Sequence, residues 1–169
     1  MQPVFIDFEA SSLSPASWPI EVGIARVDQG KVLVDSKLIR PHQTWSMSEW
    51  HEDSAAIHGI SLDELADAEP AEDVARWLAD GIAGELVLSD APEFDQRWLD
   101  RLMSVVDDDH GIELADFDEK VWQAFSQEYG TGAAGRIHTV YKAGANRQST
   151  HRAGADAADL AHAWLAGCS

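Results

Sequence analysis

The sequence predicts an α/β protein with one mixed β-sheet, antiparallel on one side and parallel on the other, flanked by helices. Two observations predict this class. Three strand patterns occupy residues 4–39; small polar residues and a proline follow the first, and a tight turn joins the second to the third, which indicates an antiparallel meander. Beyond residue 70 helical and strand patterns alternate, which is typical of parallel pairing.

The opening of the chain contains the meander. Residues 4–9 are apolar, β-branched or aromatic at most positions and too few for a core helix, so they form the first expected strand. Strands at 19–28 and 31–39 follow, with Gln29-Gly30 as the tight turn between them. These strands are therefore expected to be antiparallel neighbours.

The remaining elements follow from periodicity and capping residues. Residues 41–52 lack a regular pattern, and residues 129–150, rich in glycine and small side chains, have the least expected order. We expect strands 4–9 and 85–89 to be central neighbours. The other expected elements are a short helix near 53–57 ended by Gly59, a capping box at 61–64, helices at 70–82, 93–103, 121–125 and from 152, and strands at 85–89 and 112–117.

Length and composition indicate one globular domain over residues 1–169. The chain is 45% hydrophobic and 25% charged, which is ordinary for a folded domain. Its apolar runs are too short to span a bilayer, and its first residues carry no secretory leader pattern. Cys168 is the single cysteine and cannot form an internal disulfide. We therefore expect a cytoplasmic protein without membrane association.

The formal net charge of −18 argues against a broad surface for long nucleic acid, because such binding uses Lys and Arg against phosphate. A site for nucleic-acid ends stays open, since bound metal ions reverse the local charge. The charge is uneven: residues 129–155 contain no acid, but they do contain Arg136, Lys142, Arg147 and Arg152. This stretch is either a solvated basic loop or a flank that contacts phosphate.

The first strand carries two carboxylates, Asp7 and Glu9. Side chains two apart on a strand point to the same face, so both acids leave one side of an apolar strand. Two neighbouring like charges are costly unless a cation neutralises them, and Mg²⁺ or Mn²⁺ suits closely spaced carboxylates. The alternative is an edge strand whose acids face water.

Further candidates lie at the starts of two expected helices. Asp95 is in the first turn of the helix at 93–103, and His151 and Asp156 open the last helix. Small residues, Ala157 and Ala161 among them, would let that helix approach the sheet closely. Each candidate also has a plainer interpretation: a helix-dipole acid for Asp95, a solvent-facing acid for Asp156 and a helix-start polar group for His151.

Together these residues resemble the DEDD superfamily of 3′–5′ exonucleases, in its DEDDh branch. Asp7-Phe8-Glu9 is similar to the first motif, and Phe94-Asp95 followed by Trp98-Leu99 is similar to the second. His151, four residues and Asp156 are similar to the third, where a histidine marks the branch. The resemblance covers essentially the whole chain.

Two places depart from the family's usual pattern. The family often has threonines after the first-motif glutamate, where this chain has Ala10, Ser11 and Ser12. It often has a His-Asn pair before the second-motif aspartate, where this chain has Ser89-Asp90 and one extra loop residue. These positions border the substrate, so they leave its identity open.

The resemblance implies a ribonuclease-H-like fold and hydrolysis with two divalent metal ions, Mg²⁺ or Mn²⁺. On this basis Asp7 would bridge the ions, and Glu9, Asp95 and Asp156 would complete their ligand shells. His151 would be the general base, because imidazole titrates near the operating pH.

The resemblance also implies where the substrate lies. Residues after the first motif would contact the terminal nucleotide, and His58 is either a further substrate contact or simply a helix-terminus residue. Basic residues near the third motif are candidate phosphate contacts. The substrate-binding set is Phe8, Ser11, Ser12, Leu13, His58, Arg147 and Arg152.

The expected function is removal of nucleotides from the 3′ ends of single-stranded or short nucleic acid. A non-catalytic binding or scaffold module of the same fold is one alternative, and a phosphodiesterase for a small nucleotide-containing substrate is another. Ribose or deoxyribose, a protein partner and dimerisation stay open. Trp45 and Trp50 suit substrate stacking, partner binding or the core.

Overall fold

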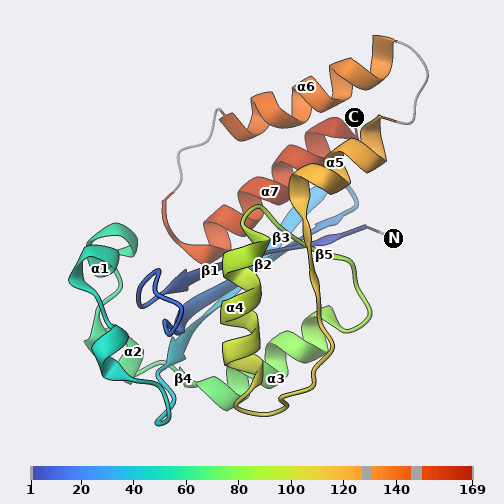
Figure 1. The fold of residues 1–169 in the computed structure, drawn as a ribbon. Coiled ribbons are helices and arrows are strands. Elements are labelled where there is room, and N and C mark those ends of the chain that lie inside the picture. Colours follow the sequence, from blue (N-terminus) through green and yellow to red (C-terminus); the bar gives the residue numbers. More distant parts are fainter. Residues whose placement is uncertain (1, 127–130, 146–149, 169) are drawn as a thin grey trace.

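The chain forms a six-stranded mixed β-sheet with helices on both faces (Figure 1). The structure is a computed structural model, and it describes residues 2–126, 131–145 and 150–168. Within these residues the strand order is β4-β3-β2-β1-β5-β6. One half of the sheet is an antiparallel meander and the other half is parallel, as predicted.

The central strand β1 pairs antiparallel with β2 and parallel with β5, which confirms that the 4–9 and 85–89 patterns are neighbours. Gln29 and Gly30 turn β2 into β3 with φ angles of 47° and 76°, the left-handed backbone of tight hairpins. The edge strand β4 was not predicted, because two residues carry no pattern. The strands are β1 (Val4–Ala10), β2 (Pro19–Asp28), β3 (Lys31–Arg40), β4 (Glu69–Pro70), β5 (Val87–Ser89) and β6 (Leu114–Asp116).

Helix ends follow the capping residues of the sequence. Ser61 and Glu64 form the predicted capping box, and Gly59, with φ of 69°, ends α1. No described helix has the length and apolar character needed to cross a membrane. The helices are the 3₁₀ turn η1 (Met47–Glu49), α1 (Glu52–His58), α2 (Leu62–Ala66), α3 (Ala71–Ile82), α4 (Pro92–Met103), α5 (Phe117–Phe125), α6 (Thr131–Ala145) and α7 (Ala153–Gly167).

The expectation of little order at 129–150 was wrong for α6. This helix packs against α7, where Val140 is fully buried. A Cβ on Gly167 would lie 2.5 Å from Cγ2 of Val140, so the glycine permits the close approach. Packing against α7 stabilises a helix whose glycine-rich sequence predicts it poorly.

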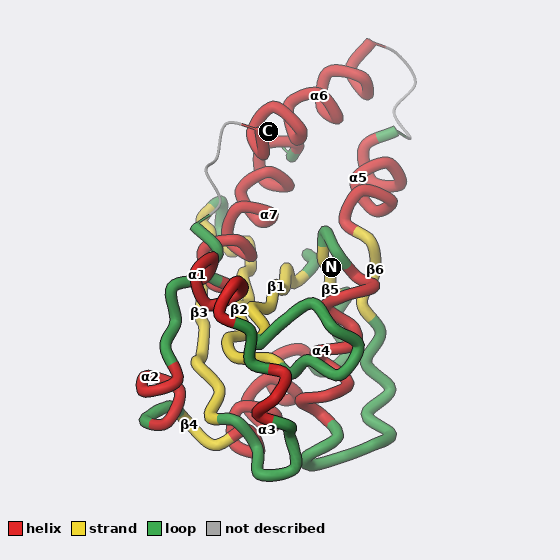
Figure 2. Tube along the Cα trace, turned by 60° about the vertical axis from the view of Figure 1, so that its left-hand side comes forward, coloured by secondary structure: helices red, strands yellow, loops and turns green. Residues whose placement is uncertain are grey.

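Alternation along β1 divides the core between the two faces of the sheet. Ile6 and Phe8 pack with α3 and α4, whereas Phe5 packs with α5, α6 and α7. Figure 2 shows these two sets of helices on opposite sides of the strands. Asp7 and Glu9 share the parity of Phe5, so they face α7.

The first turn of α7 touches the backbone of β2. A Cβ on Gly23 would lie 2.2 Å from the carbonyl carbon of Ala153, so only glycine fits without a shift of the helix or strand. Ala157 and Ala161 are fully buried further along the helix, as their small size predicted. This contact sets the height of α7 above the sheet.

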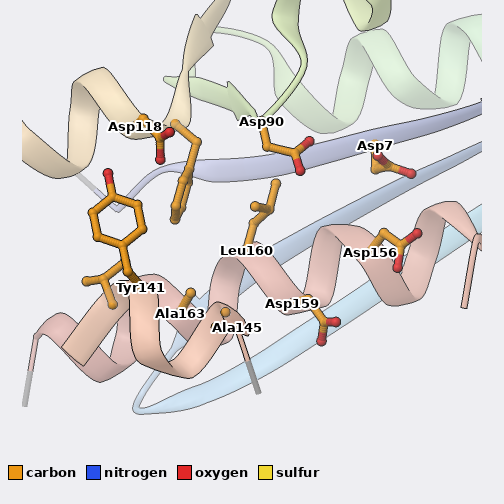
Figure 3. A pocket seen from close by; sticks show the side chains of 12 residues that line it. Asp7, Asp90, Asp118, Tyr141, Ala145, Asp156, Asp159, Leu160 and Ala163 are labelled. Atoms are coloured by element: carbon orange, nitrogen blue, oxygen red, sulfur yellow. The ribbon is translucent and has the colours of Figure 1, made fainter. Parts of the chain in front are cut away.

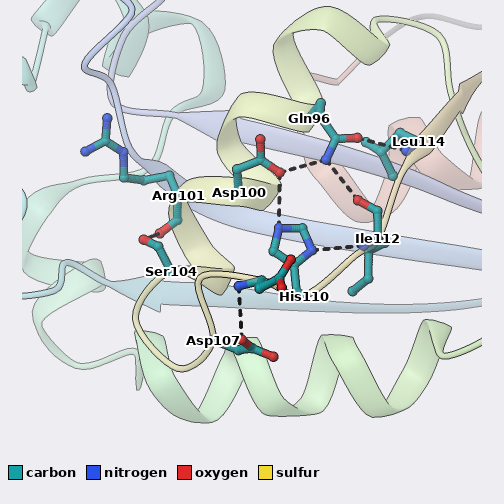
Figure 4. Close-up of polar contacts among 9 residues, drawn as sticks. Gln96, Asp100, Arg101, Ser104, Asp107, His110, Ile112 and Leu114 are labelled. Atoms are coloured by element: carbon teal, nitrogen blue, oxygen red, sulfur yellow. Dashed lines mark hydrogen bonds and ion pairs between the residues drawn. The ribbon is translucent and has the colours of Figure 1, made fainter.

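The connection from α4 to β6 is tied by side chains (Figure 4). His110 Nδ1 accepts from the N–H of Ile112 at 3.1 Å, so its Nε2 carries the proton that faces Asp100 at 3.2 Å. Gln96 donates to Asp100 and accepts from the N–H of Leu114 at 2.8 Å. These bonds join β6 to the helix whose first turn holds Asp95.

Candidate active site

Acidic side chains from β1 meet the first turns of α4 and α7 near the carboxyl end of β1. Asp7 and Glu9 come from the strand, Asp95 from the first turn of α4 and Asp156 from the first turn of α7. Their oxygens gather in two groups, each with ligand atoms within 4.8 Å of one another.

The Asp7 group consists of Asp7, Asp90 and Asp95. Asp95 is 1% exposed, and its Oδ2 accepts a hydrogen bond from the hydroxyl of Ser89. The backbone of Phe8 also hydrogen-bonds to Asp95 and favours its ionised form. Because β5 ends at Ser89, Asp90 leaves the sheet beside Asp7 and joins the group.

The His151 group consists of Glu9, His151 and Asp156. His151 is exposed and has φ of 51°, a left-handed conformation that is uncommon outside glycine. Such strain often accompanies functional residues. Of the two groups, the His151 group is the one that contains an imidazole. It can therefore exchange a proton through a nitrogen base, which the Asp7 group cannot.

Burial and crowding raise the pKa values of the acids. Burial and then the charges of Asp95 and Glu9 hold the pKa of Asp7 well above its usual range. Burial and then Asp156 raise the pKa of Glu9 to about 7, and burial raises the pKa of Asp95 to about 7. Ionising all these acids together therefore needs a compensating cation.

The donor set fits a hard divalent cation. The two groups offer five carboxylates and one imidazole, and oxygen-rich sets of this kind suit Mg²⁺ or Mn²⁺. Their convergence from β1, the end of β5, α4 and α7 gives a site built on regular elements.

An ion pair between half-exposed Arg152 and buried Glu21 fixes the start of α7. The guanidinium of Arg152 donates from Nε and Nη2 to the two oxygens of Glu21, each at 2.9 Å. The N–H of Ala153 donates to the same carboxylate at 3.1 Å. Glu21 lies on β2 and is 3% exposed, so the residue directly after His151 is tied to the sheet. Arg152, a predicted phosphate contact, thus already has a carboxylate partner.

The comparison with family models identifies this arrangement. A model of the RNase T exonuclease family matches residues 4–163. The chain belongs to this family. The mixed sheet agrees with the ribonuclease-H-like architecture that the sequence analysis expected.

Solved structures of exonucleases share the fold. E. coli Exonuclease I in complex with a dT13 oligonucleotide has a TM-score of 0.67 at 19% identity, over 97% of this chain and 40% of that chain. Exonuclease I from Methylocaldum szegediense has a TM-score of 0.67 at 16% identity, over 97% and 40%. This chain therefore spans about 40% of the length of those exonucleases.

A 3′-exonuclease described by its 3′-end-specific recognition of the histone mRNA stem-loop has a TM-score of 0.69 at 15% identity. The match covers 97% of this chain and 80% of that one. Among curated protein sequences, none matches this chain significantly. At identities of 15–19%, these structural matches support the fold alone.

The structure brings together the five residues that the sequence proposed as the catalytic centre of this exonuclease-family domain. Asp7 and Asp95 fall in one group, and Glu9, His151 and Asp156 fall in the other. The strand–helix geometry that the sequence predicted for them is present.

The predicted substrate-binding residues have different surroundings. Ser11 and Ser12 are buried, and Ser11 Oγ accepts from the N–H of Trp18 at 3.0 Å. Phe8 is 4% exposed, and its ring lies in the core on the face opposite Asp7. Leu13 is 70% exposed. Arg147 lies outside the described residues.

His58 lies against a stack of tryptophans. The rings of Trp45 and Trp50 lie 6.0 Å and 6.1 Å from that of Trp18, with interplanar angles of 18° and 26°. Trp50 meets His58 edge-on, and His58 Nδ1 accepts from the N–H of Ile60 at 3.1 Å. The other ring nitrogen, Nε2, is buried and has no hydrogen-bond partner in the described structure. The two loop tryptophans thus belong to the packed wall that holds His58.

Two site residues escaped the sequence analysis. Asp90 was noted only as a departure from the family's pattern, yet its position directly after a strand beside β1 was the available signal. Glu21 was part of the expected strand at 19–28 and had no assigned role. Its partner, Arg152, lies 131 residues away, and no local pattern reveals that pairing.

Proposed function

We propose that residues 1–169 form a single domain that hydrolyses phosphodiester bonds at the 3′ end of single-stranded or short nucleic acid. The observation that carries this proposal is the convergence of the Asp7 group and the His151 group in a member of an exonuclease family. Five carboxylates, of which Asp7, Glu9 and Asp95 have raised pKa values, meet one imidazole near the carboxyl end of β1. The expected cytoplasmic location stays a prediction.

Asp7, Glu9, Asp95 and Asp156 would hold two divalent ions, Mg²⁺ or Mn²⁺. When bound, the ions would supply the charge that activates a water and stabilises the leaving oxygen. His151 Nε2 or Nδ1 accepts a proton from that water. The water oxygen bonds to phosphorus as the bond from phosphorus to the 3′-oxygen breaks. The 3′-oxygen takes a proton from solvent, and His151 returns its proton to solvent. The products are a nucleoside 5′-monophosphate and a chain one nucleotide shorter with a 3′-hydroxyl.

The residues after β1 would bind the terminal nucleotide. Leu13 offers exposed apolar surface there, and Ser11 and Ser12 shape the loop that carries it. His58 would contact the substrate through Nε2, because that nitrogen has no partner among the described residues. Solved structures with this fold include complexes with single-stranded oligonucleotides, which supports a single-stranded end as substrate.

The direct test is a time course with 5′-labelled single-stranded RNA and DNA in Mn²⁺. We expect a ladder that shortens from the 3′ end for at least one sugar, and its loss in Asp7→Ala. Asp108→Ala, a change of equal charge in an exposed loop, should keep the ladder. Cleavage that survives Asp7→Ala would contradict the assigned centre.

Further measurements on the same protein distinguish the alternative functions. A protein that binds no Mn²⁺ in calorimetry would be a non-catalytic module of this fold. A protein that cleaves a chromogenic thymidine phosphodiester but no oligonucleotide would be a phosphodiesterase for small substrates. Nanomolar affinity for long duplex DNA that salt barely changes would contradict the preference for single-stranded or short ends.

A further inference from the structure

One border of the sheet is open along most of β3. The short strand β4 pairs with β3 only at Ile39 and Arg40, so residues 31–38 have no neighbouring strand on that side among the described residues. The helix α7 makes its closest approach over β2, at Gly23, and not over this border. Most of β3 therefore presents an uncovered strand edge.

The backbone of this edge can bond to a further strand. In an antiparallel hairpin, successive residues bond alternately to the neighbouring strand and to the outside. Asp28 and Lys31 flank the two-residue turn and pair with one another, so the outward-bonding residues are Val32, Val34 and Ser36. In the part of the chain that the structure describes, no other segment bonds to the backbone of these three residues.

The side chains of the edge are apolar on both faces of the sheet. Leu33 is 53% exposed and Val34 is 48% exposed, and alternation places them on opposite faces. Residues 31–38 contain no proline, and their ladder with β2 has no bulge, although both devices often protect sheet edges. Lysines protect edges too, so the fate of this edge depends on what Lys31 and Lys37 would face.

The edge is complementary to itself in one antiparallel register. When two copies pair about a two-fold axis at Leu33, Val32 lies opposite Val34 of the second copy, and Lys31 lies opposite Asp35. The axis repeats each pair, so two opposite-charge pairs flank a central pair of leucines. Neither Lys31 nor Asp35 has an ion-pair partner in the described structure.

The neighbouring registers lack this complementarity. An axis at Val34 would place Lys31 opposite Lys37, and an axis at Asp35 would place the two copies' Asp35 carboxylates opposite each other. Like charges directly opposite in a ladder are destabilising. An axis one residue before Leu33 would bring the turn into the ladder. The charges of the edge thus favour the axis at Leu33.

We propose that two copies of this chain associate through β3, antiparallel about Leu33, and form one continuous sheet. The paired stretch has balanced charges, although each copy has a net charge of −18. Residues directly opposite in this ladder point to the same face, so both α7 helices lie on one face of the joined sheet. Figure 3 shows Asp156, on α7, and Asp7, on β1, on that face. Both proposed centres therefore lie on the same face of the dimer.

Sedimentation velocity over a concentration series tests the association with the full chain. Wild type should shift from monomer to dimer as its concentration rises. Lys31→Glu and Asp35→Lys should each weaken the dimer at least tenfold, because each puts two like-charged pairs across the axis. An equimolar mixture of the two variants should form a dimer of wild-type strength, because all its cross-strand charge pairs are opposite in sign.

The control separates register from overall charge. Asp35→Lys lowers the net negative charge of each copy, so general repulsion between acidic chains would predict a stronger dimer for this variant. Asp108→Lys makes the same change in an exposed loop and should not weaken the dimer. Circular dichroism checks that each variant folds. A wild type that stays monomeric, which would leave the edge for a strand of another protein, overturns the proposal, as does a mixture no stronger than its components.

A disulfide locates the axis. In Cys168→Ser protein, Leu33→Cys should give a cross-linked dimer on a non-reducing gel after mild oxidation, because the two residues at the axis lie about 4.5 Å apart. Asp35→Cys should not cross-link, because four residues of strand separate the two positions by about 13 Å. Cross-linking at residue 35 without cross-linking at residue 33 overturns the proposed register.

Discussion

The Asp7 group and the His151 group are built in different ways. The Asp7 group lies where β1, β5 and α4 meet, and hydrogen bonds from Ser89 and the backbone of Phe8 hold Asp95 in it. The His151 group takes two of its three members from the start of α7. That start is tied to β2 by the pair of Arg152 with Glu21 and by the close approach of Ala153 to Gly23.

The difference separates two chemical tasks. The Asp7 group holds only carboxylates, which concentrate negative charge for cations. The His151 group adds an exposed imidazole, which can exchange protons with water. The carboxylates of the Asp7 group thus lie where β1, β5 and α4 meet, whereas the imidazole precedes a helix whose placement depends on β2.

The largest effect is expected for a substitution within the Asp7 group. Asp95→Asn should lower the rate of 3′-end cleavage by about a thousandfold, because several kcal/mol of charge stabilisation in the transition state is lost. Since the buried charge disappears, the metal-free protein should also unfold at a higher temperature at pH 8. Single-turnover kinetics and thermal unfolding measure the two effects. Asp108→Asn, on an exposed loop, should change neither.

The next largest effect is expected for a substitution in β2 that displaces α7 and with it the His151 group. Gly23→Ala puts a Cβ 2.2 Å from the carbonyl carbon of Ala153, so α7 must move from β2. We expect a loss of about 3 kcal/mol in the free energy of unfolding, measured in urea, together with lower activity. Gly81→Ala is the matched control in α3, because its Cβ would meet nothing nearer than 3.6 Å. If both variants lost equal stability, the close approach of α7 would not be the cause.

The pH dependence of stability measures what the buried acids of both groups cost the metal-free protein, because Glu9 and Asp95 each have a pKa of about 7. The pKa of Asp95 is about 7 in the folded protein and near 4 unfolded, so the folded state holds more protons between these values. Stability of the metal-free protein should therefore fall by a few kcal/mol as pH rises from 4 to 7. Thermal unfolding across this range checks it. Asp95→Asn should reduce the slope to the part that Asp7 and Glu9 contribute, and Mg²⁺ at pH 8 should stabilise wild type far more than this variant.

The smallest effect is expected for a substitution that weakens the ion pair at the start of α7 without a steric clash. Glu21→Gln removes the charge that pairs with Arg152, and the half-exposed guanidinium can turn to water. We expect a loss of about 1–2 kcal/mol in stability and a roughly tenfold drop in kcat with little change in KM, since His151 is misplaced. Glu69→Gln breaks an exposed pair with Lys37 and should cost under about 0.5 kcal/mol. A change in KM alone would assign Glu21 to substrate binding.

Much of this architecture was predictable because it is local. The alternation in residues 4–9 placed Asp7 and Glu9 on one face, and the short turn at 29–30 fixed the meander. The predicted strand at 85–89 begins only at Val87, because Glu85 and Leu86 are exposed before it. The short helix α1 begins at Glu52, one residue before the expected range of 53–57.

What the sequence could not predict depends on contacts distant along the chain. The helix α6 forms against α7, and the enabling feature is a glycine, Gly167, more than twenty residues further on. Asp90 joins Asp7 only because β5 and β1 are neighbours that end near one another. Glu21 meets Arg152 across the sheet in the same way. Periodicity identifies faces, but it does not say which faces meet.

The stacked rings of Trp18, Trp45 and Trp50 give the wall beside His58 an optical property of its own. Indoles about 6 Å apart and nearly parallel share electronic excitation, which splits their absorption into coupled bands of opposite circular dichroism. That couplet reports the spacing of the rings and not the helix content. A nucleotide that shifts His58 would disturb Trp50 and hence the couplet, so occupancy of this wall could be followed in unlabelled protein.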